Sequence, residues 1–150
     1  ALNSEGPRSI DSKDFERILA FDRKCFRHRR DRLLRQLLTR FRDSSFVTMR
    51  NGGVLGYIVG KNYDTTCEIG PWLCSREDTS IAASLLRAVL STSIGKSVEM
   101  TVPSSNRQAL GLLRNYDFED QGSVVRMYYG DRTGFPDDRY TFAAESLERG

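Results

Sequence analysis

The sequence predicts an α+β fold with three α/β/α layers, in which helices cover both faces of a mixed, mostly antiparallel sheet. Two helical patterns come first, three strand patterns joined by short turns follow, and helical and strand patterns then alternate. Short turns make neighbouring strands antiparallel, whereas a helix between two strands makes them parallel. With 150 residues and 39% hydrophobic residues, we expect a single domain spanning residues 1–150.

Two helices are expected at the N-terminal end. Residues 10–26 place apolar side chains at helical spacing, with Ser9 or Asp11 as the cap. A second, arginine-rich helix follows within residues 23–42, with arginines along one side and apolar residues along the other, namely Leu33, Leu34, Leu37, Leu38 and Phe41. Both helices are therefore expected to pack one face onto the sheet.

Three strands follow the helices. Residues 45–50 alternate as in a strand, Asn51-Gly52-Gly53 marks a tight turn, and residues 54–60 pair back. The third strand covers residues 66–73 and contains Gly70-Pro71. Because proline has no N–H to donate, this strand must lie at an edge or diverge from a neighbour at Pro71.

The second half alternates helices and strands. Capping residues at 75–80 introduce a helix over 81–93, a strand follows at 97–102, and a helix follows over 107–116. A strand is expected at residues 123–129. Beyond turns at Gly134 and Pro136, residues 139–147 predict one more short element whose type the pattern does not decide.

Positive charge is concentrated in the second helix. The net charge is +3, but residues 23–42 carry nine cations against one anion, Asp31. Three interpretations remain open: a core-packing helix with a solvated cationic face, a lip over an anionic ligand, or a nucleic-acid surface. Nucleic acid is the weakest partner, since no stacking aromatics interleave with the arginines.

The cysteines and the absence of targeting patterns indicate a compartment. Cys25, Cys67 and Cys74 are an odd number without framework spacing, which favours free thiols in a reducing, cytoplasmic setting. No apolar run is long enough to cross a membrane, and no secretion signal is visible. The first residue is Ala1, which is compatible with excision from a longer chain.

The sequence lacks the residues that several other kinds of catalytic or binding site require. His28 is the only histidine, so no catalytic triad is available. Cys25 and His28 with Cys67 and Cys74 do not have the spacing of a structural zinc site, and we expect no metal. Phosphate-binding loops of the nucleotide-hydrolase and dinucleotide types are absent from the sequence.

The order of elements resembles the GCN5-related N-acetyltransferase (GNAT) superfamily, whose members transfer acyl groups from acyl-coenzyme A to amines. Its cofactor loop reads Gln/Arg-x-x-Gly-x-Gly/Ala before a pair of leucines. If Leu85-Leu86 is that pair, the loop falls on residues 77–82, where Ile81 and Ala82 fit but Glu77 and Ser80 do not. The resemblance implies that residues Thr79, Ser80, Ile81 and Ala82 bind the diphosphate of acetyl-CoA or another acyl-CoA. Glu77 and Asp78 must then point away, or the cofactor binds weakly.

Further positions follow from the same resemblance. Asn106 matches the family's asparagine after the fifth strand and is expected near the pantetheine arm. The family's general-acid tyrosine falls on Leu113, which cannot give a proton, so that role passes to Tyr116, to another group or to none. The family's Gly-Phe pair falls on Asp117-Phe118.

The diverging third strand is the expected place for the thioester. Gly70, with Trp72 and Leu73 after it, would offer unpaired main-chain groups to the cofactor's amides. Glu68, two residues earlier, is the candidate general base, although an exposed ion-pair partner is the simpler interpretation of one strand glutamate.

A closer similarity is to the acetyltransferase-like C-terminal domain of certain two-domain GNAT proteins, which implies an upstream GNAT domain as a partner. The segments that carry this similarity are Asp31-Arg32 with Leu33-Leu34, Gly56-Tyr57, Ile69-Gly70-Pro71, Val102-Pro103 to Asn106, Arg126-Met127 with Gly130, and Gly150. We therefore expect an acyl-CoA-dependent N-acyltransferase domain acting on a small-molecule or peptide amine. The alternative is a catalytically degenerate GNAT-fold domain that binds a ligand or supports another domain.

Overall fold

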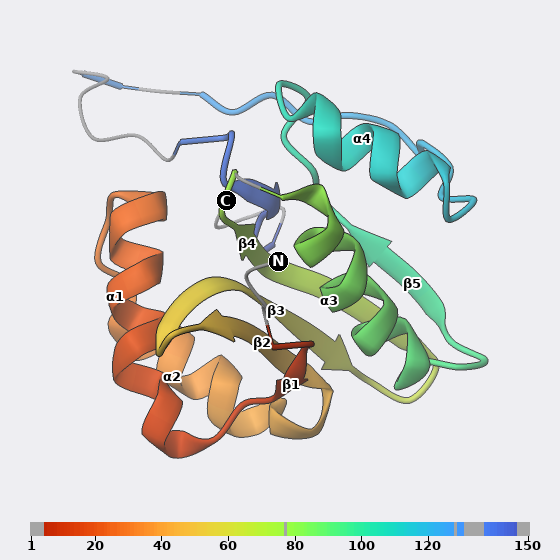
Figure 1. Cartoon of the computed structure of the whole chain (residues 1–150). Coiled ribbons are helices and arrows are strands. Elements are labelled where there is room, and N and C mark those ends of the chain that lie inside the picture. Colours follow the sequence, from red (N-terminus) through yellow and green to blue (C-terminus); the bar gives the residue numbers. More distant parts are fainter. Residues whose placement is uncertain (1–4, 77, 128, 131–136, 147–150) are drawn as a thin grey trace.

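A computed structural model describes residues 5–76, 78–127, 129–130 and 137–146. Figure 1 shows a central sheet with helices on both sides. The strands are β1 (Arg8–Ser9), β2 (Ser45–Arg50), β3 (Gly53–Asn62), β4 (Thr66–Cys74), β5 (Ser97–Met100) and β6 (Thr141–Ala143). The helices are α1 (Phe15–Phe26), α2 (Asp31–Arg40), α3 (Thr79–Ser91) and α4 (Arg107–Arg114), with short 3-10 turns η1 (Ser12–Asp14) and η2 (Arg42–Ser44). This confirms the predicted fold class.

The sheet is antiparallel except at one junction. Within the described residues the strand order is β1-β2-β3-β4-β5, and β6 pairs with β4 beside this path. Strands β4 and β5 are parallel, because α3 lies between them in the chain. Their pairing runs from Thr66 opposite Ser97 to Ile69 opposite Met100 and ends there. The expected divergence of the third predicted strand at Gly70-Pro71 is therefore confirmed.

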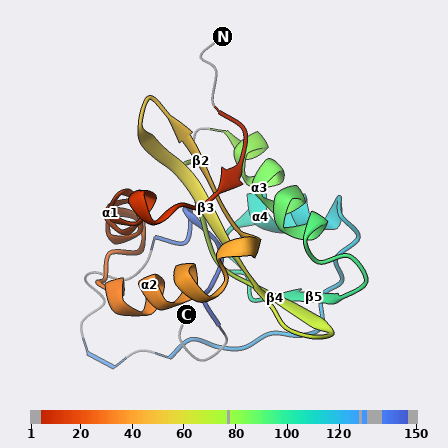
Figure 2. The ribbon, with the colours of Figure 1, turned by 90° about the horizontal axis from the view of Figure 1, so that it is seen from below.

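Two hydrophobic cores cover the two faces of the sheet. Figure 2 shows α1 and α2 on one side and α3 and α4 on the other. Leucines of α2, including Leu34 and Leu38, pack with α1 against Val47 and Val59. On the opposite face α3 and α4 pack onto β3, β4 and β6, with Leu85, Leu86 and Leu113 among the buried residues. The amphipathic patterns of the sequence thus decided which helix faces lie inside.

A buried ion pair ties the first two helices to the sheet. The carboxylate of Asp22 in α1 accepts two hydrogen bonds from Arg30, at 2.9 and 2.8 Å. It also accepts one from the hydroxyl of Tyr57 in β3. The Arg30 guanidinium stacks over Phe26 at 3.6 Å from the ring centroid. One arginine of the cationic segment therefore belongs to the core, and it fixes the connection between α1 and α2.

The structure corrects two of the expectations from the sequence. The first predicted helix begins later, since Asp11 caps η1 and Ser9 lies in β1, which pairs with β2. Residues 123–127 and 129–130 form no strand. Val125 and Met127 there are 86% and 88% exposed, so no apolar contact supports a strand. The predicted turns at Gly134 and Pro136 lie outside the described residues.

The element predicted within residues 139–147 is the short strand β6. Its sequence could not reveal this, because three residues are too few to show a strand period. Its partner β4 lies nearly 70 positions earlier in the chain, so only the tertiary structure brings the two together.

Gly60 in β3 tests how tightly α3 packs on the sheet, and Gly111 in α4 serves as the control. A Cβ at Gly60 would lie 2.7 Å from Val89 Cγ1 and 2.9 Å from the Ser44 carbonyl oxygen, whereas nothing lies within 4 Å of one at Gly111. We expect Gly60→Ala to lower the free energy of unfolding by about 2 kcal/mol through overpacking. Gly111→Ala should raise it by about 0.5–1 kcal/mol because helical glycine is entropically costly. Urea unfolding measures both, and equal effects of the two substitutions would contradict the packing.

Candidate functional site

The N-terminus of α3 is capped by its own acidic residue. Asp78 accepts a hydrogen bond from the Ser80 N–H at 2.8 Å, and hydrogen bonds from Ser80 hold the pKa of this carboxyl below its usual value. The Ile81 N–H donates to the Asp78 carbonyl oxygen at 3.3 Å, so two of the N–H groups expected to face a diphosphate are already bound within the chain. Glu77 lies outside the described residues.

The predicted loop residues divide between a groove and the core. Thr79 and Ser80 line an open groove of about 310 Å³ between α3 and α4, whereas Ile81 and Ala82 are buried in the core beneath it. From α4 and the residue after it the groove is lined by Arg107, Gln108, Gly111, Leu112 and Asn115. Arg107 is the cation of this groove, and Thr79 and Ser80 add hydroxyl groups.

The side chains that line this groove suit an anionic ligand. A guanidinium binds phosphate oxygens through paired N–H donors, and hydroxyl groups and a helix N-terminus add further donors. Asp78 opposes the same ligand, because its charge stands at the start of α3. The groove residues on α4 were not predicted as ligands, since only Asn106 before them matched the motif.

The edge of β4 beyond Gly70 is covered by the chain itself. β6 pairs with it, placing Ala143 opposite Trp72 and Thr141 opposite Leu73. The Cys74 N–H donates to the Tyr140 carbonyl oxygen at 3.0 Å. The expectation of unpaired main-chain groups along this edge is therefore wrong, because β6 takes the position beside β4 that β5 leaves. Contact of the cofactor with Gly70, Trp72 and Leu73 remains a prediction.

Gly70 permits this close approach. A Cβ at Gly70 would lie 1.9 Å from the Ala144 carbonyl oxygen, and its φ of +150° is one that side-chain-bearing residues rarely adopt. The ring of Trp72, which is fully buried, lies 5.0 Å from that of Phe142. The space beside β4 from Gly70 onward is therefore filled by the chain itself.

Asn106 links α4 to β6. Its side-chain oxygen accepts from the Ala109 N–H at 3.0 Å and so caps α4, while its side-chain nitrogen donates to the Thr141 carbonyl oxygen at 2.8 Å. The side chain is buried, with both groups satisfied inside the protein. Its predicted contact with a pantetheine arm remains a prediction.

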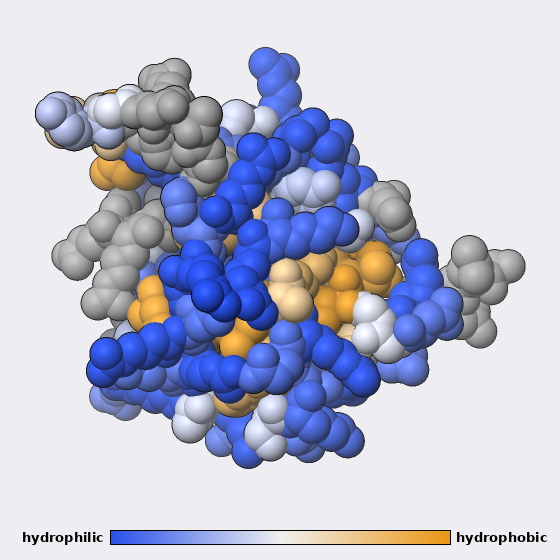
Figure 3. Space-filling model, turned by 90° about the vertical axis from the view of Figure 1, so that its left-hand side faces the viewer, coloured by the Kyte–Doolittle hydropathy of each residue, from blue (hydrophilic) through white to orange (hydrophobic). Residues whose placement is uncertain are grey.

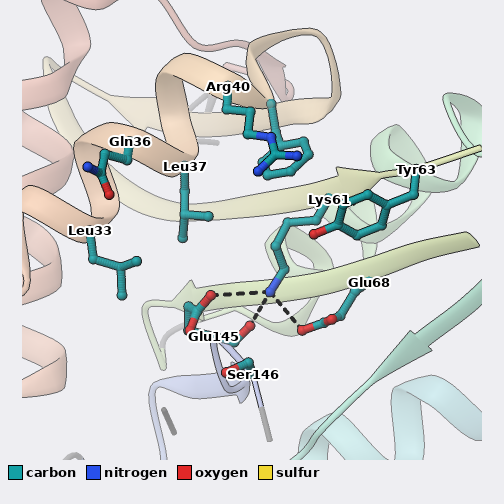
Figure 4. A pocket seen from close by; sticks show the side chains of 10 residues that line it. Leu33, Gln36, Leu37, Arg40, Lys61, Tyr63, Glu68, Glu145 and Ser146 are labelled. Carbon is teal, nitrogen blue, oxygen red and sulfur yellow. Dashed lines mark hydrogen bonds and ion pairs between the residues drawn. The ribbon is translucent and has the colours of Figure 1, made fainter. Parts of the chain in front are cut away.

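Glu68 lines a second pocket, of about 340 Å³, on the α2 side of the sheet (Figure 4). Its carboxylate lies 2.7 Å from the Lys61 ammonium. Lys61 is 3% exposed and also donates to the main-chain oxygen of Glu145, whose carboxylate lies 3.4 Å away. Leu33, Leu37 and Phe41 supply apolar walls, and Arg40 and Tyr63 also line the pocket.

The position of Glu68 is compatible with both of its expected roles, a general base and an ion-pair partner. The residue is an ion-pair partner, yet about a third of its side chain remains exposed at the pocket. Lys61 and Glu145 were not predicted, because a lysine inside a strand pattern and a glutamate near the chain end carry no motif. The Glu68 carboxylate is therefore accessible as well as positioned.

Tyr116 lies apart from Glu68. Its hydroxyl accepts a hydrogen bond from Arg87 of α3 at 2.9 Å, and the ring packs on the core beneath α3 and α4. It lines neither the groove nor the Glu68 pocket. Its role as a general acid remains a prediction, with Leu113 buried at the position where the family carries tyrosine.

The cysteines are not nucleophiles in this conformation. All three are buried and free, and burial raises the pKa of Cys25 to about 12 and the pKa of Cys74 further. Among the described residues no cluster of His, Cys, Asp and Glu is arranged to hold a metal ion. No helix in that part of the chain is long and apolar enough to cross a membrane.

Five of the nine cations of residues 23–42 form ion pairs. Besides the buried Arg30, pairs join Arg23 to Asp31, Arg27 to Asp137, Arg35 to Glu16 and Arg42 to Asp11. Figure 3 shows the molecule from the left of Figure 1, the side where α1 lies, with hydrophilic side chains over most of that face and hydrophobic ones between them. This arrangement agrees with a core-packing helix that carries a solvated cationic face.

A family model described as acetyltransferase (GNAT) domain matches residues 18–143. The chain belongs to the GNAT acetyltransferase family. The match runs from α1 through β6, so it includes the groove and the Glu68 pocket of this GNAT domain. No protein of curated function matches the sequence.

Solved structures share the fold of this GNAT domain at low sequence identity. Ard1 from Thermoplasma volcanium is 22% identical, with 77% of this chain and 83% of that one covered and a TM-score of 0.67. Arabidopsis thaliana Naa50, in complex with the bisubstrate analogue CoA-Ac-MVNAL, is 14% identical, with 85% and 91% covered and a TM-score of 0.70. Diaminobutyrate acetyltransferase EctA from Paenibacillus lautus, in complex with L-2,4-diaminobutyric acid and coenzyme A, is 19% identical, with 77% and 75% covered and a TM-score of 0.64.

The buried ammonium of Lys61 should be important for stability. Lys61→Met leaves the Glu145 carboxylate, which is 6% exposed, without its cation, and we expect the free energy of unfolding to fall by about 3 kcal/mol. The same substitution at exposed Lys13 should change it by less than about 0.5 kcal/mol. Urea unfolding at neutral pH compares the two, and matching stabilities would contradict the assignment of a buried charge cluster.

Proposed function

We propose that this GNAT domain is an acyl-CoA-dependent N-acyltransferase that transfers an acyl group to an amine. The observation that carries the proposal is the groove at the start of α3, where Thr79 and Ser80 face Arg107 of α4. It offers an anion the donors of a helix N-terminus together with a guanidinium. Family membership supports the same activity.

Acetyl-CoA or another acyl-CoA supplies the thioester, whose acyl carbon is attacked by the amine and whose carbon–sulfur bond then breaks. In our proposal Thr79, Ser80 and Arg107 hold the diphosphate, with Ile81 and Ala82 supplying the main chain beneath it. The path of the pantetheine arm is lined by Gly70, Trp72, Leu73 and Asn106.

Two residues are proposed to move protons during the transfer. Glu68 takes a proton from the substrate ammonium so that the nitrogen lone pair is free to attack. The departing thiolate needs a proton, for which Tyr116 is the candidate donor.

The acceptor is proposed to be a small-molecule or peptide amine that enters the pocket beside Glu68. Apolar walls next to a carboxylate suit an amine carried on an apolar body. Among the similar structures, Naa50 is bound to the bisubstrate analogue CoA-Ac-MVNAL and EctA to L-2,4-diaminobutyric acid. A peptide that begins Met-Val-Asn-Ala-Leu and L-2,4-diaminobutyric acid are therefore the first two acceptor types to assay.

We further propose that residues 1–150 form one domain, the C-terminal one of a two-domain GNAT protein in the cytoplasm. The support is the motif similarity given above, together with three buried free thiols. An upstream GNAT domain would then be its partner.

Two substitutions in the groove should move acyl-CoA affinity in opposite directions. Arg107→Gln removes a phosphate-binding cation, and we expect the dissociation constant to rise about tenfold. Asp78→Asn keeps an effective helix cap but removes a negative charge, so the dissociation constant should fall, by up to about 30-fold. Isothermal titration with acetyl-CoA and with free coenzyme A measures both, and no binding by any form at millimolar ligand would overturn the proposed function.

Substitution of Glu68 in β4 tests its proposed role as the general base. We expect Glu68→Gln to lower kcat by about 100-fold while acetyl-CoA binding is retained, because the amide cannot accept the proton. Glu119 is exposed beyond the end of α4, so Glu119→Gln is the matched control and should leave kcat unchanged. Thiol release on the two acceptor types reports both variants, and equal rates for them would remove Glu68 from the mechanism.

A further inference from the structure

Residues 139–146, which we name the strap, cover the edge of β4 beyond its divergence from β5. Main-chain hydrogen bonds hold the strap on both sides. The Cys74 N–H in β4 donates to the Tyr140 oxygen at 3.0 Å, and the Ala144 N–H donates to the Thr101 oxygen, just after β5, at 2.8 Å. The strap therefore fills the gap between the two strands.

The two ends of the strap meet the two candidate sites. Thr141 accepts a hydrogen bond from Asn106, the residue directly before Arg107 of the groove. At the other end Glu145 and Ser146 line the pocket that contains Glu68. A molecule that reached from the groove to Glu68 along β4 would follow the path that the strap now occupies.

The contact between strap and β4 leaves buried polar groups unsatisfied. Trp72 Nε1, Thr141 Oγ1 and Glu145 Oε2 are buried and have no hydrogen-bond partner. Such groups regain hydration when they are exposed, so their burial opposes docking of the strap. Phe142 and Ala143, which are buried against the core of α3 and α4, favour it. The docked state is thus held by a balance of opposing contributions.

We propose that the strap is an autoinhibitory segment that occupies the course of the acyl-CoA arm and leaves β4 when acyl-CoA binds. This inference rests on the proposed function. Once the strap is displaced, the main-chain groups of β4 and the residues Gly70, Trp72 and Leu73 face the ligand, and Glu145 leaves Lys61 while Glu68 stays on β4. Binding of acyl-CoA is then weakened by the cost of undocking the strap.

Hydrogen exchange on the unmodified chain tests the displacement. We expect acetyl-CoA at saturation to increase at least tenfold the exchange rate of the Ala144 amide, through which the docked strap binds Thr101. The amide of Val59 within β3 serves as the reference and should not change. Saturation with acetyl-CoA while the Ala144 amide stays protected overturns the strap proposal and leaves the proposed function intact.

A reversible tether provides a second test. Ser105 Oγ and Asp138 Oδ2 lie 2.9 Å apart, at the entrance to the strap, so a disulfide in the double variant Ser105→Cys with Asp138→Cys would hold it in place. We expect at least tenfold weaker acetyl-CoA binding in the oxidised form, with recovery on reduction. Equal binding in the two redox forms contradicts autoinhibition.

Loosening the strap should have the opposite effect. Phe142→Ala removes the ring that packs on Trp72, and we expect severalfold tighter acetyl-CoA binding. Leu34→Ala, in the core beneath α1 and α2, is the matched truncation and should lower thermal stability without tightening binding. If neither the unmodified chain nor Phe142→Ala binds acetyl-CoA, the proposed function fails. If both bind acetyl-CoA equally well, only the strap proposal fails.

Discussion

The parting of β4 from β5 after Ile69 is the constraint on which the rest of the structure depends. Buried main-chain N–H and C=O groups require partners, and a strand that loses its neighbour in the interior of a sheet must find another. This chain supplies that partner from its own C-terminal region, and Gly70 makes room for it. The filled gap then separates the groove on the α3 side from the pocket on the α2 side.

Buried charge holds each side of the sheet in place. On the α1 and α2 side, Asp22 joins Arg30 to the Tyr57 hydroxyl, so the helix connection cannot move without breaking a buried ion pair. At the far end of the strap, Lys61 plays a similar part for Glu68 and Glu145. In each cluster a buried charge is compensated by an opposite charge within hydrogen-bonding distance.

Most of the predicted elements were right because their signals are local. The hairpin around Asn51-Gly52-Gly53, the helix after residues 75–80 and the helix after Asn106 each rest on neighbouring turn or capping residues. The strand predicted at residues 123–129 is absent from the described residues of that range, because the residue types of a segment supply no hydrogen-bonding partner for it. Among the site residues, Thr79, Ser80 and Glu68 do line cavities, whereas Ile81 and Ala82 are in the core.

The sequence by itself determined most of the helices and the longer strands, the apolar faces of the helices, the caps of α3 and α4 and the break at Gly70-Pro71, since each depends on residues a few positions apart. Only the tertiary structure decided that Arg107 faces Thr79, that Lys61 lies between Glu68 and Glu145, and that Thr141–Ala143 covers β4. Those contacts join residues about 7 to 84 positions apart, most of them across different elements. Their formation depends on how the sheet diverges and packs, which no local pattern of side chains encodes.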